Sequence, residues 1–289
     1  MTQVIDGKKI SKALREKIQN EVAELKAAGK RVPGLAVIQV GDDQASSVYV
    51  KNQEKACEKA GFVFFNCQLP ADTTEEALLQ KVKELNEDPK VDGIICQMPL
   101  PEGIDADVVI NNIRPDKDVD GFHPVNAGKL LQGKADAVLP CTPAGVIEML
   151  KYEKIPLQGK NVVVLGRSNI VGKPAALLLL KENCTVTICH SKTQNLAEVA
   201  SKADILVSAL GRAKMVDASY TNSDQVVIDV GINRDENGKL CGDVDYEDVA
   251  PKVKAITPVP GGVGSMTIAI LLNNTLKDYK RHEGIPVED

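Results

Sequence analysis

Short apolar runs alternate with helical patterns along the first half of the chain. Branched and other apolar residues concentrate in three stretches: PGLAVIQVG (33–41), GFVFFNCQL (61–69) and VDGIICQMPL (91–100). Apolar positions recur with helical spacing at roughly 10–18, 46–60 and 74–86. Strands that alternate with helices in this way are typical of a mostly parallel sheet covered by helices.

The second half resumes this alternation after a loop-rich junction. Residues 101–142 are dense in Pro, Asp and Gly. Thr142-Pro143 then predicts a helix to about Leu150, with Thr as N-cap and Pro at the first helical position. Further strands are expected at 161–166, 185–190, 203–211 and 226–232. Ser265 can cap a last long helix, whose apolar positions need a surface to pack against.

These patterns predict an α/β fold with two domains and a cleft between them. A chain of 289 residues is long enough for two domains, each with its own core. We expect residues 1–140 to form the first domain and residues 141–264 the second. The final helix, within 265–289, is expected to pack back on the first domain.

Composition narrows the class of protein. The net charge of −5 argues against a nucleic-acid binder, which would show a basic stripe, and five Tyr, four Phe and no Trp offer little surface for stacking bases. No apolar run is long enough to span a bilayer, and the first ten residues carry charges where a signal peptide needs an apolar stretch. Seven cysteines without a C-x-x-C pair give no support for a metal site. We therefore expect a cytoplasmic protein.

The segment LGRSNIVGKPAALLLL (165–180) lies where a dinucleotide fingerprint belongs, after an apolar strand and before an apolar helix. Its pattern is G-x-S-x-x-V-G and not G-x-G-x-x-G. Gly166 still permits a sharp turn, Ser168 is small, and Gly172 permits close packing of helix on strand. The backbone N–H groups at the start of the helix would then face a phosphate. The alternative is an ordinary turn between a strand and a helix.

The end of the next strand indicates which dinucleotide would bind. An NAD site has Asp or Glu about 20 residues after the glycines, to bind the ribose 2′-OH. Here the sequence has His190, Ser191, Lys192 and Thr193, with Arg167 inside the phosphate turn. Cationic and hydroxyl side chains bind a 2′-phosphate that a carboxylate would repel. The sequence therefore favours NADP over NAD.

Two further segments leave alternatives open. PDKDVDGFHP (115–124) begins like an EF-hand loop, but Ala127 stands where that loop needs a bidentate Glu, so calcium is rejected. Asp120 is then either part of a solvated acidic loop or a binding carboxylate. PVPGGVG (258–264) is either a structural turn or a loop whose backbone approaches a ligand closely.

A polar pair stands out in SSVYVKNQEKAC (46–57), which predicts the start of an amphipathic helix. Ser46 or Ser47 can cap this helix, and its core-facing positions are Val48, Val50, Ala56 and Cys57. Tyr49 and Gln53 are four residues apart and project from one side. The pair is either a solvated edge or part of a site.

Together these segments resemble one family nearly end to end. The chain is similar to FolD-type methylenetetrahydrofolate dehydrogenase/methenyltetrahydrofolate cyclohydrolases. The resemblance rests on YVKNQEKAC, VDGIICQMPLP, RPDKDVDGFHP, CTPAGVIEML, GRSNIVGKP, VVIDVGINR, GDVDYED and TPVPGGVGSMT. Several long motifs in a fixed order are far more specific than a single glycine fingerprint.

The resemblance implies a homodimer in which the first domain binds folate and the second, Rossmann-like domain binds NADP. It implies oxidation of 5,10-methylenetetrahydrofolate to the methenyl form, which water then opens to 10-formyltetrahydrofolate. It places catalytic and substrate-binding roles on Tyr49, Gln53, Gln97 and Asp120. The implied NADP site consists of Gly166, Arg167, Ser168, Ser191 and Ile232, and the backbone of Pro260, Gly261 and Gly262 would border the folate.

Two positions depart from the family pattern. Ser265 replaces a usual Pro, which we expect to matter little because Ser can cap the last helix. Gln53 replaces the Lys of the family's Tyr-x-x-x-Lys pattern, so the pair looks into the site but lacks its ionisable member. We therefore expect dehydrogenation to survive and hydrolysis to be weakened. The alternative is a non-catalytic relative that binds the dinucleotide and folate.

Overall fold

The computed structural model describes residues 2–287, which fold into two compact units. One unit comprises Met1–Lys12 with Pro140–Ile270, and the other comprises Ala13–Leu139 with Leu271–Asp289. We call them the 140–270 unit and the 13–139 unit. Both contain parallel sheets with helices, so the predicted two-domain α/β class is confirmed. No helix among the described residues has the length and hydrophobicity needed to cross a membrane.

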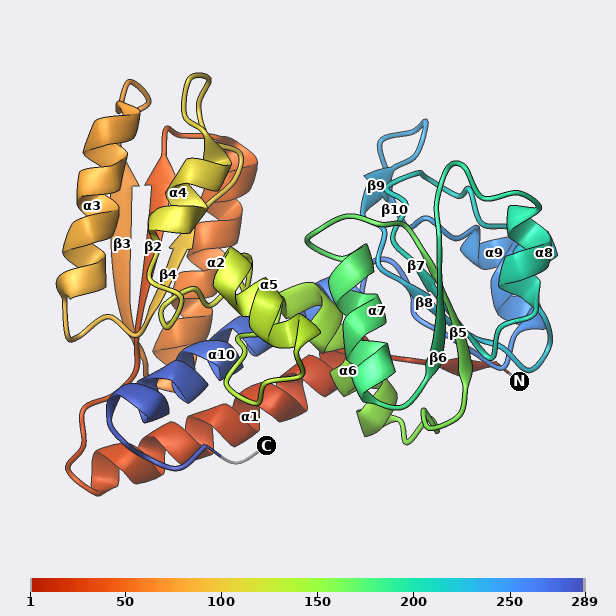
Figure 1. Ribbon diagram of the computed structural model, residues 1–289, viewed down its shortest axis with the longest axis horizontal. Helices are drawn as coiled ribbons and strands as arrows, with labels where there is room; N and C mark the ends of the chain where they lie inside the picture. The colour runs from red at the N-terminus through yellow and green to blue at the C-terminus, as the bar shows by residue number, and fades with distance from the viewer. Residues whose placement is uncertain (1, 288–289) are drawn as a thin grey trace. The chain divides into compact units, whose positions relative to one another are not determined.

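The 13–139 unit is built on a three-stranded parallel sheet in the order β3-β2-β4 (Figure 1). The strands are β2 (Gly34–Val40), β3 (Val63–Leu69) and β4 (Gly93–Cys96). β2 is buried along its whole length, as expected for the central strand of a sheet covered on both faces. All three strands lie inside the predicted apolar runs.

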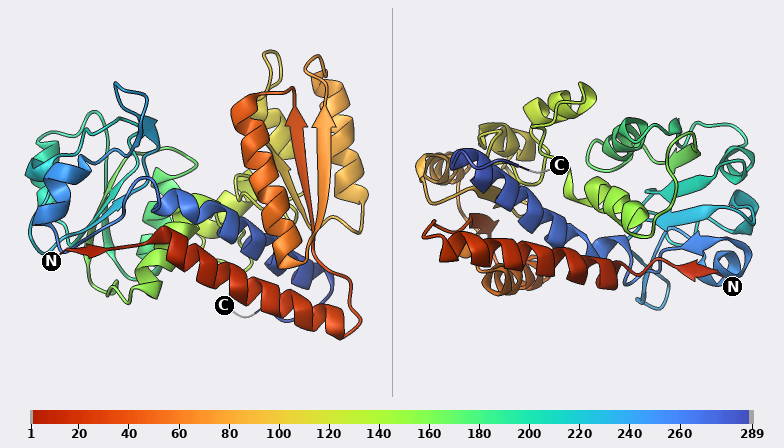
Figure 2. Two further views of the ribbon diagram at one scale, coloured as in Figure 1. Left: turned by 180° about the vertical axis from the view of Figure 1, so that it is seen from behind. Right: turned by 90° about the horizontal axis from the view of Figure 1, so that it is seen from below.

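Helices cover both faces of this sheet (Figure 2). Alternate residues of β2, including Ala36 and Ile38, pack with α3 (Glu75–Glu87) and α4 (Ala106–Asn112). α2 (Gln44–Ala60) lies on the opposite face and is joined to β3 by a short turn. α4 and α5 (Pro124–Leu131) lie in the stretch that the sequence predicted to be loop-rich, because both are too short to show a clear helical period.

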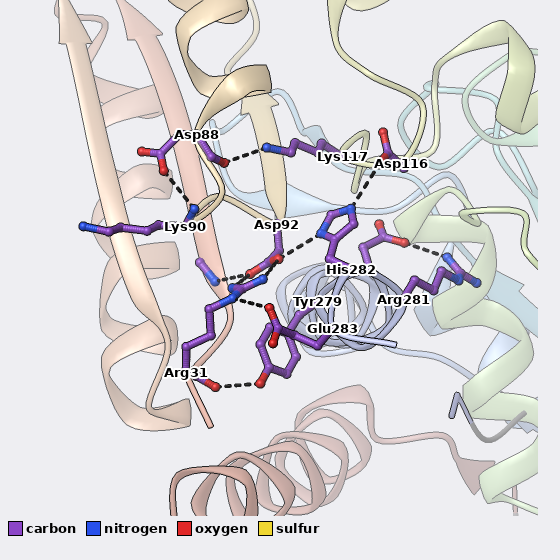
Figure 3. A network of polar contacts seen from close by, with 12 residues as sticks. Arg31, Asp88, Lys90, Asp92, Asp116, Lys117, Tyr279, Arg281, His282 and Glu283 are labelled. Atoms are coloured by element: carbon purple, nitrogen blue, oxygen red, sulfur yellow. Dashed lines mark hydrogen bonds and ion pairs between the residues drawn. The ribbon is translucent and has the colours of Figure 1, made fainter. Parts of the chain in front are cut away.

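The end of α10 (Thr267–His282) is fixed to the sheet through the buried carboxylate of Asp92 (Figure 3). Asp92 accepts two hydrogen bonds of 2.7 Å from Arg31, one of 2.9 Å from the Gly34 N–H, and contacts His282 Nδ1 at 2.9 Å. The Tyr279 hydroxyl also donates to the carbonyl of Arg31 at 2.6 Å. Burial alone would raise the pKa of Asp92, but these partners hold that pKa below its usual value.

The 140–270 unit contains a six-stranded, wholly parallel sheet in the order β1-β11-β8-β7-β5-β6. Its strands are β1 (Gln3–Val4), β5 (Asn161–Leu165), β6 (Thr185–Cys189), β7 (Ile205–Ser208), β8 (Val226–Asp229) and β11 (Ala255–Ile256). The chain passes from β5 outward to β6 and then returns to β7 on the other side of β5. This reversal of strand order makes a topological switch point at the carboxyl end of β5, where dinucleotide-binding sheets hold their ligand.

Helices also cover both faces of the six-stranded sheet (Figure 1). α6 (Cys141–Tyr152) and α7 (Gly172–Lys181) pack together on one face. α8 (Leu196–Ser201) and α9 (Tyr246–Val249) pack on the other, around a core that includes Leu165, Leu206 and Val227. A small antiparallel pair, β9 (Asn233–Arg234) and β10 (Leu240–Cys241), follows β8. The sheet is therefore doubly wound.

The first residues of the chain lie elsewhere than the sequence predicted. Residues 1–12 belong to the 140–270 unit because β1 pairs with β11, with Gln3 opposite Ala255. α1 (Gly7–Ala27) follows directly and is much longer than the predicted stretch of 10–18. A two-residue edge strand leaves no periodic pattern, so this pairing has no signal in the sequence.

Three predicted helix starts are wrong by one to three residues. α2 begins at Gln44, since the carboxylate of Asp43 accepts the Ser46 N–H at 2.8 Å and acts as N-cap in place of either serine. α6 begins at Cys141 after Pro140, so Thr142 lies inside the helix. Ser265 closes a 3-10 turn (Val263–Ser265), and α10 starts at Thr267. Of the four expected core positions of α2, Val48 is 60% exposed, whereas the other three are buried.

Candidate functional site

The turn after β5 requires glycine at two positions. Gly166 has a φ of +118°, and a Cβ there would overlap the carbonyl of Ala209 at the end of β7. A Cβ at Gly172 would overlap the carbonyl of Gly166, so the first residue of α7 can lie against the turn only as glycine. The turn is therefore shaped as a dinucleotide-binding sheet requires, although its middle position is Ser168.

Ser168 acts on the backbone of the same turn. Its hydroxyl oxygen accepts hydrogen bonds from the N–H groups of Val171 at 3.1 Å and Gly172 at 3.3 Å. The sequence predicts only a small residue with a hydroxyl donor at this position. Within the part of the chain that the structure describes, the N–H groups of residues 167–170 have no acceptor. These exposed donors precede a helix N-terminus, which is the arrangement that binds a phosphate.

The end of β6 lies beside this turn, because β6 pairs with β5 and Gly166 donates to the carbonyl of Cys189 at 2.9 Å. The loop that follows is closed by His190, whose N–H donates to Thr193 Oγ1 at 2.9 Å. Ser191 and Arg167 both remain exposed on the adjacent strand ends. Residues 190–193 include no carboxylate. The residues present therefore fit a phosphorylated ribose.

A cavity of about 200 Å³ lies at the carboxyl end of β8. It is lined by residues 229–232, Leu240 and the whole of 258–265. The structure thus brings Ile232, predicted to contact the cofactor, together with Pro260, Gly261 and Gly262, predicted to border the substrate. Ile232 is 65% exposed, so its side chain is accessible to a ligand in the cavity.

Two buried aspartates behind this cavity were not singled out from the sequence. Asp229 ends β8 and Asp243 follows β10, and their side chains accept hydrogen bonds mainly from backbone N–H groups. In the sequence, Asp229 is marked only as an acid at the end of an apolar run, in VVIDVG. Asp243 is marked only as an acid between glycine and valine, in GDVD.

The predicted substrate residues of the 13–139 unit gather at the carboxyl edge of its sheet. Gln97 follows β4 and donates its N–H to Ile38 at 2.8 Å. The first turn of α2 contacts the same segment, since the Ser46 hydroxyl donates to the Met98 carbonyl at 3.4 Å. The segment 117–119 runs parallel to β4 and places Asp120 at this edge as well. Tyr49, Gln97 and Asp120 are all half-buried.

Gln53 lies one helical turn beyond Tyr49 and is only 1% exposed. Its side-chain oxygen has no hydrogen-bond partner in the described structure. Lys51 and Lys55 are both exposed, as expected for residues on other faces of α2. Position 53 therefore holds a buried, incompletely satisfied amide at the site edge.

Asp118 organises the acidic segment that resembles a calcium loop. Its carboxylate accepts the N–H groups of Gly121, Phe122 and His123 at 3.1, 3.3 and 2.8 Å, and the Asn126 amide at 2.9 Å. The sequence interpretation missed this role, because an acid that caps a turn resembles a solvated one in sequence. The described residues contain no cluster of three or more His, Cys, Asp or Glu able to hold a metal ion.

Comparison with known proteins matches each unit to a domain of one family. Residues 5–120 match the tetrahydrofolate dehydrogenase/cyclohydrolase catalytic domain, and residues 140–283 match the NAD(P)-binding domain of the same family. The chain belongs to the tetrahydrofolate dehydrogenase/cyclohydrolase family.

Individual relatives match over nearly the full length. The bifunctional protein FolD of Lachnoclostridium phytofermentans is 56% identical over 98% of this chain and 100% of its own length. That of Bacillus subtilis is 54% identical over 96% and 98%. The crystal structure of the Campylobacter jejuni enzyme superposes with a TM-score of 0.94 at 44% identity, covering 97% and 99%. A Trypanosoma brucei FolD complexed with NADP and an inhibitor gives a TM-score of 0.91 at 40% identity, covering 97% and 98%.

The family domains divide the candidate residues into two sets. The catalytic domain contains Tyr49, Gln53, Gln97 and Asp120, and the NAD(P)-binding domain contains the glycine turn, Ser191 and the cavity beside Ile232. Each set occupies the carboxyl edge of a parallel sheet, where the ends of neighbouring strands bring residues distant in sequence together.

Proposed function

We propose that this protein oxidises 5,10-methylenetetrahydrofolate to 5,10-methenyltetrahydrofolate with NADP. The observation that carries the proposal is an intact nucleotide turn within a chain that matches bifunctional FolD proteins from end to end. Tyr49, Gln97 and Asp120 are present at one sheet edge of the catalytic domain. This retention favours an active enzyme over a non-catalytic relative.

The cofactor is NADP and not NAD because of the side chains around the ribose position. Arg167 and Ser191 would hold the 2′-phosphate by charge-assisted and neutral hydrogen bonds. The N–H groups of residues 167–170 would bind a second phosphate group. NAD lacks the 2′-phosphate and would leave Arg167 without this partner.

Once bound, NADP supplies the acceptor for a hydride removed from the one-carbon bridge. The protein's own residues bind and orient the substrate. Asp120 accepts hydrogen bonds from the amino and N–H groups of the pterin, and Gln97 and Tyr49 hold the one-carbon unit. The backbone of Pro260, Gly261 and Gly262 borders the folate. Because the product is a cation formed without proton transfer, this step needs alignment more than acid–base groups.

Hydrolysis of the methenyl product is proposed to be weak in this protein. The attacking water must lose a proton and a ring nitrogen must gain one. A general acid–base group contributes about 10²–10⁴-fold to such transfers. The Gln53 amide has no titratable proton near neutral pH. Bifunctionality is a property of the named relatives, and we propose that this chain mainly retains their dehydrogenase step.

We also propose a cytoplasmic homodimer, on the basis of the family resemblance. β6 supports association because it is the edge strand of the six-stranded sheet and is largely exposed, including Ile188 at 40%. Light scattering should give twice the mass of the 31.0 kDa chain. A monomeric mass at assay concentrations would contradict this assembly.

The direct test mixes the protein with methylenetetrahydrofolate and NADP and follows the absorbance of NADPH. We expect turnover, with a strong preference for NADP over NAD. Arg167→Ala should weaken the use of NADP while leaving NAD nearly unchanged, and Lys181→Ala, an exposed cation at the far end of α7, is the matched control. Absence of turnover would support the non-catalytic alternative. Equal losses for both cofactors would contradict the 2′-phosphate role of Arg167.

A further inference from the structure

Asp229 and Asp243 form a buried acidic pair behind the cavity of the NAD(P)-binding domain. Their exposed fractions are 3% and 0%. Neither carboxylate has an ion-pair partner among the described residues. Buried carboxylates without a cation are costly, and most proteins avoid them.

Backbone groups hold the two carboxylates in place. Asp229 accepts the N–H groups of Gly231 at 2.9 Å, Asp243 at 3.0 Å and Val244 at 2.9 Å. A Cβ at Gly242 would overlap the Asp229 carboxylate, so the chain passes directly over it. The position of this charge is therefore fixed and does not depend on a flexible side chain.

Asp243 accepts hydrogen bonds from the segment that follows β7 and from the first residue of β9. Its carboxylate accepts the N–H groups of Leu210 at 2.6 Å and Arg212 at 2.9 Å, beyond the end of β7. It also accepts the Asn233 amide at 2.9 Å and the Ser208 hydroxyl at 3.3 Å. These bonds neutralise part of the Asp243 charge but supply no full positive charge.

Asp229 lines the cavity that also contains Ile232 and the 258–265 loop. Two neighbouring segments place polar side chains near Asp229. The segment after β10 contributes Asp243. The segment after β11 contributes Thr257, whose hydroxyl accepts the Asp229 N–H at 2.7 Å. The 258–265 loop has no titratable side chain. The adjoining segments also carry three cations: Arg212 and Lys214 follow β7, whose Ser208 pairs with Asp229, and Lys8 lies beside Gly261.

We propose that the Asp229 carboxylate makes this cavity selective for the oxidised form of the cofactor. The nicotinamide ring carries a positive charge when oxidised and none when reduced. A fixed carboxylate in a poorly solvated wall attracts the positively charged oxidised ring. It has no such attraction for the uncharged reduced ring. The inference rests on the proposed NADP site and assigns to Asp229 a specificity role that the motifs did not indicate.

The same geometry makes this selectivity depend on pH. Burial raises the pKa of Asp229 to about 7, the nearby charge of Asp243 adds to the rise, and the surrounding N–H groups oppose it. The carboxylate is therefore ionised at pH 8 and partly protonated just below pH 7. Protonation removes the charge that distinguishes the two cofactor forms. By linkage, a tenfold selectivity requires the pKa of Asp229 to be about one unit lower with oxidised than with reduced cofactor bound.

The experiment measures dissociation constants of NADP⁺ and NADPH by calorimetry on the unmodified protein, from about pH 6 to about pH 8.5. Adenosine 2′,5′-bisphosphate, which lacks the nicotinamide, controls for titration of the 2′-phosphate and of the residues that bind it. We expect the ratio of the NADPH constant to the NADP⁺ constant to fall about tenfold as the pH is lowered, equivalent to about 1.4 kcal/mol. A ratio that does not change with pH, with both cofactors bound, would overturn the inference and leave the proposed function standing.

Asp229→Asn should abolish the pH dependence and reduce selectivity for NADP⁺ at pH 8 by about tenfold. Asp224→Asn is the matched control, since it removes an exposed carboxylate just before the other end of β8, and it should change nothing. Equal weakening of both cofactors in a folded Asp229→Asn protein would reduce Asp229 to a structural role. If neither cofactor binds the unmodified protein, both the inference and the proposed function are overturned.

Discussion

Replacing Gln53 with Lys should create or strengthen hydrolysis of methenyltetrahydrofolate. Position 53 is 1% exposed, so an ammonium there loses most of its hydration and the pKa of the new Lys falls. A drop of two to three units from about 10.4 brings that pKa to about 7.5–8.5. This is the range in which an amine can both accept and return a proton at neutral pH.

The magnitude follows from two opposing effects. The unpartnered amide oxygen of Gln53 costs the present protein about 1–3 kcal/mol, which its removal recovers. A pKa shift of two to three units costs about 3–4 kcal/mol when the Lys is charged, and little once it is neutral. Gln53→Lys should therefore be less stable than the parent at pH 6 by up to about 3 kcal/mol and similar to it at pH 9. Hydrolysis should rise at least about tenfold, and at most by the factor of about 10²–10⁴ that acid–base groups typically contribute.

The assay supplies methenyltetrahydrofolate directly and follows its loss above the uncatalysed rate. Gln53→Met is the control, because it keeps the length of the side chain and removes the amide without adding an ionisable group. It should not gain hydrolysis, whereas the gain in Gln53→Lys should increase with pH as the amine is deprotonated. If the unmodified protein already hydrolyses methenyltetrahydrofolate as fast as it oxidises methylenetetrahydrofolate, the reasoning is refuted and another residue moves the proton.

Three further changes test other parts of the structure. Asp120→Ala should raise the folate KM or abolish activity, with no dependence on added Ca²⁺ or Mg²⁺; inhibition of the unmodified enzyme by chelators would contradict this. Asp278 is 1% exposed, has one oxygen without a hydrogen-bond partner, and burial raises its pKa to about 7. Because the pKa of Asp278 is higher in the folded than in the unfolded protein, its ionised form destabilises the fold. This loss of stability is absent below about pH 4, grows as the pH rises, and is complete above about pH 7. Asp278→Asn should therefore stabilise the protein by about 1–3 kcal/mol at pH 8 and hardly at pH 4 in thermal unfolding, and equal effects at both would count against it. Gly166→Ala should reduce NADP affinity at least tenfold in calorimetry because its Cβ overlaps Ala209, and unchanged affinity would show that the turn can relax.

The sequence predicted the sheets well because their central strands are continuous apolar runs. β2, β7 and β8 lie within the predicted stretches, and the glycine turn after β5 follows from the need for close packing. The family was also identified correctly from ordered motifs.

The buried acids could not be found in the same way. Asp118, Asp229 and Asp243 are each held by backbone N–H groups from their own or neighbouring turns, so they have no partner residue at a recognisable spacing. In sequence they resemble exposed loop carboxylates. The helix starts failed for a related reason, because several Asp, Ser and Thr residues compete for each N-cap and local geometry decides among them.

The pairing of β1 with β11 affects how the protein is made. Gln3 leaves the ribosome long before its partner Ala255 is synthesised, because the two are far apart in the chain. At about 5–20 residues per second, the first strand waits on the order of 10–50 s for that partner. During translation the growing sheet therefore lacks its outermost strand, and β8 presents an unpaired edge until β11 arrives. We expect the nascent chain to depend on holding chaperones in this interval, and the final pairing to be a late, non-local step in folding.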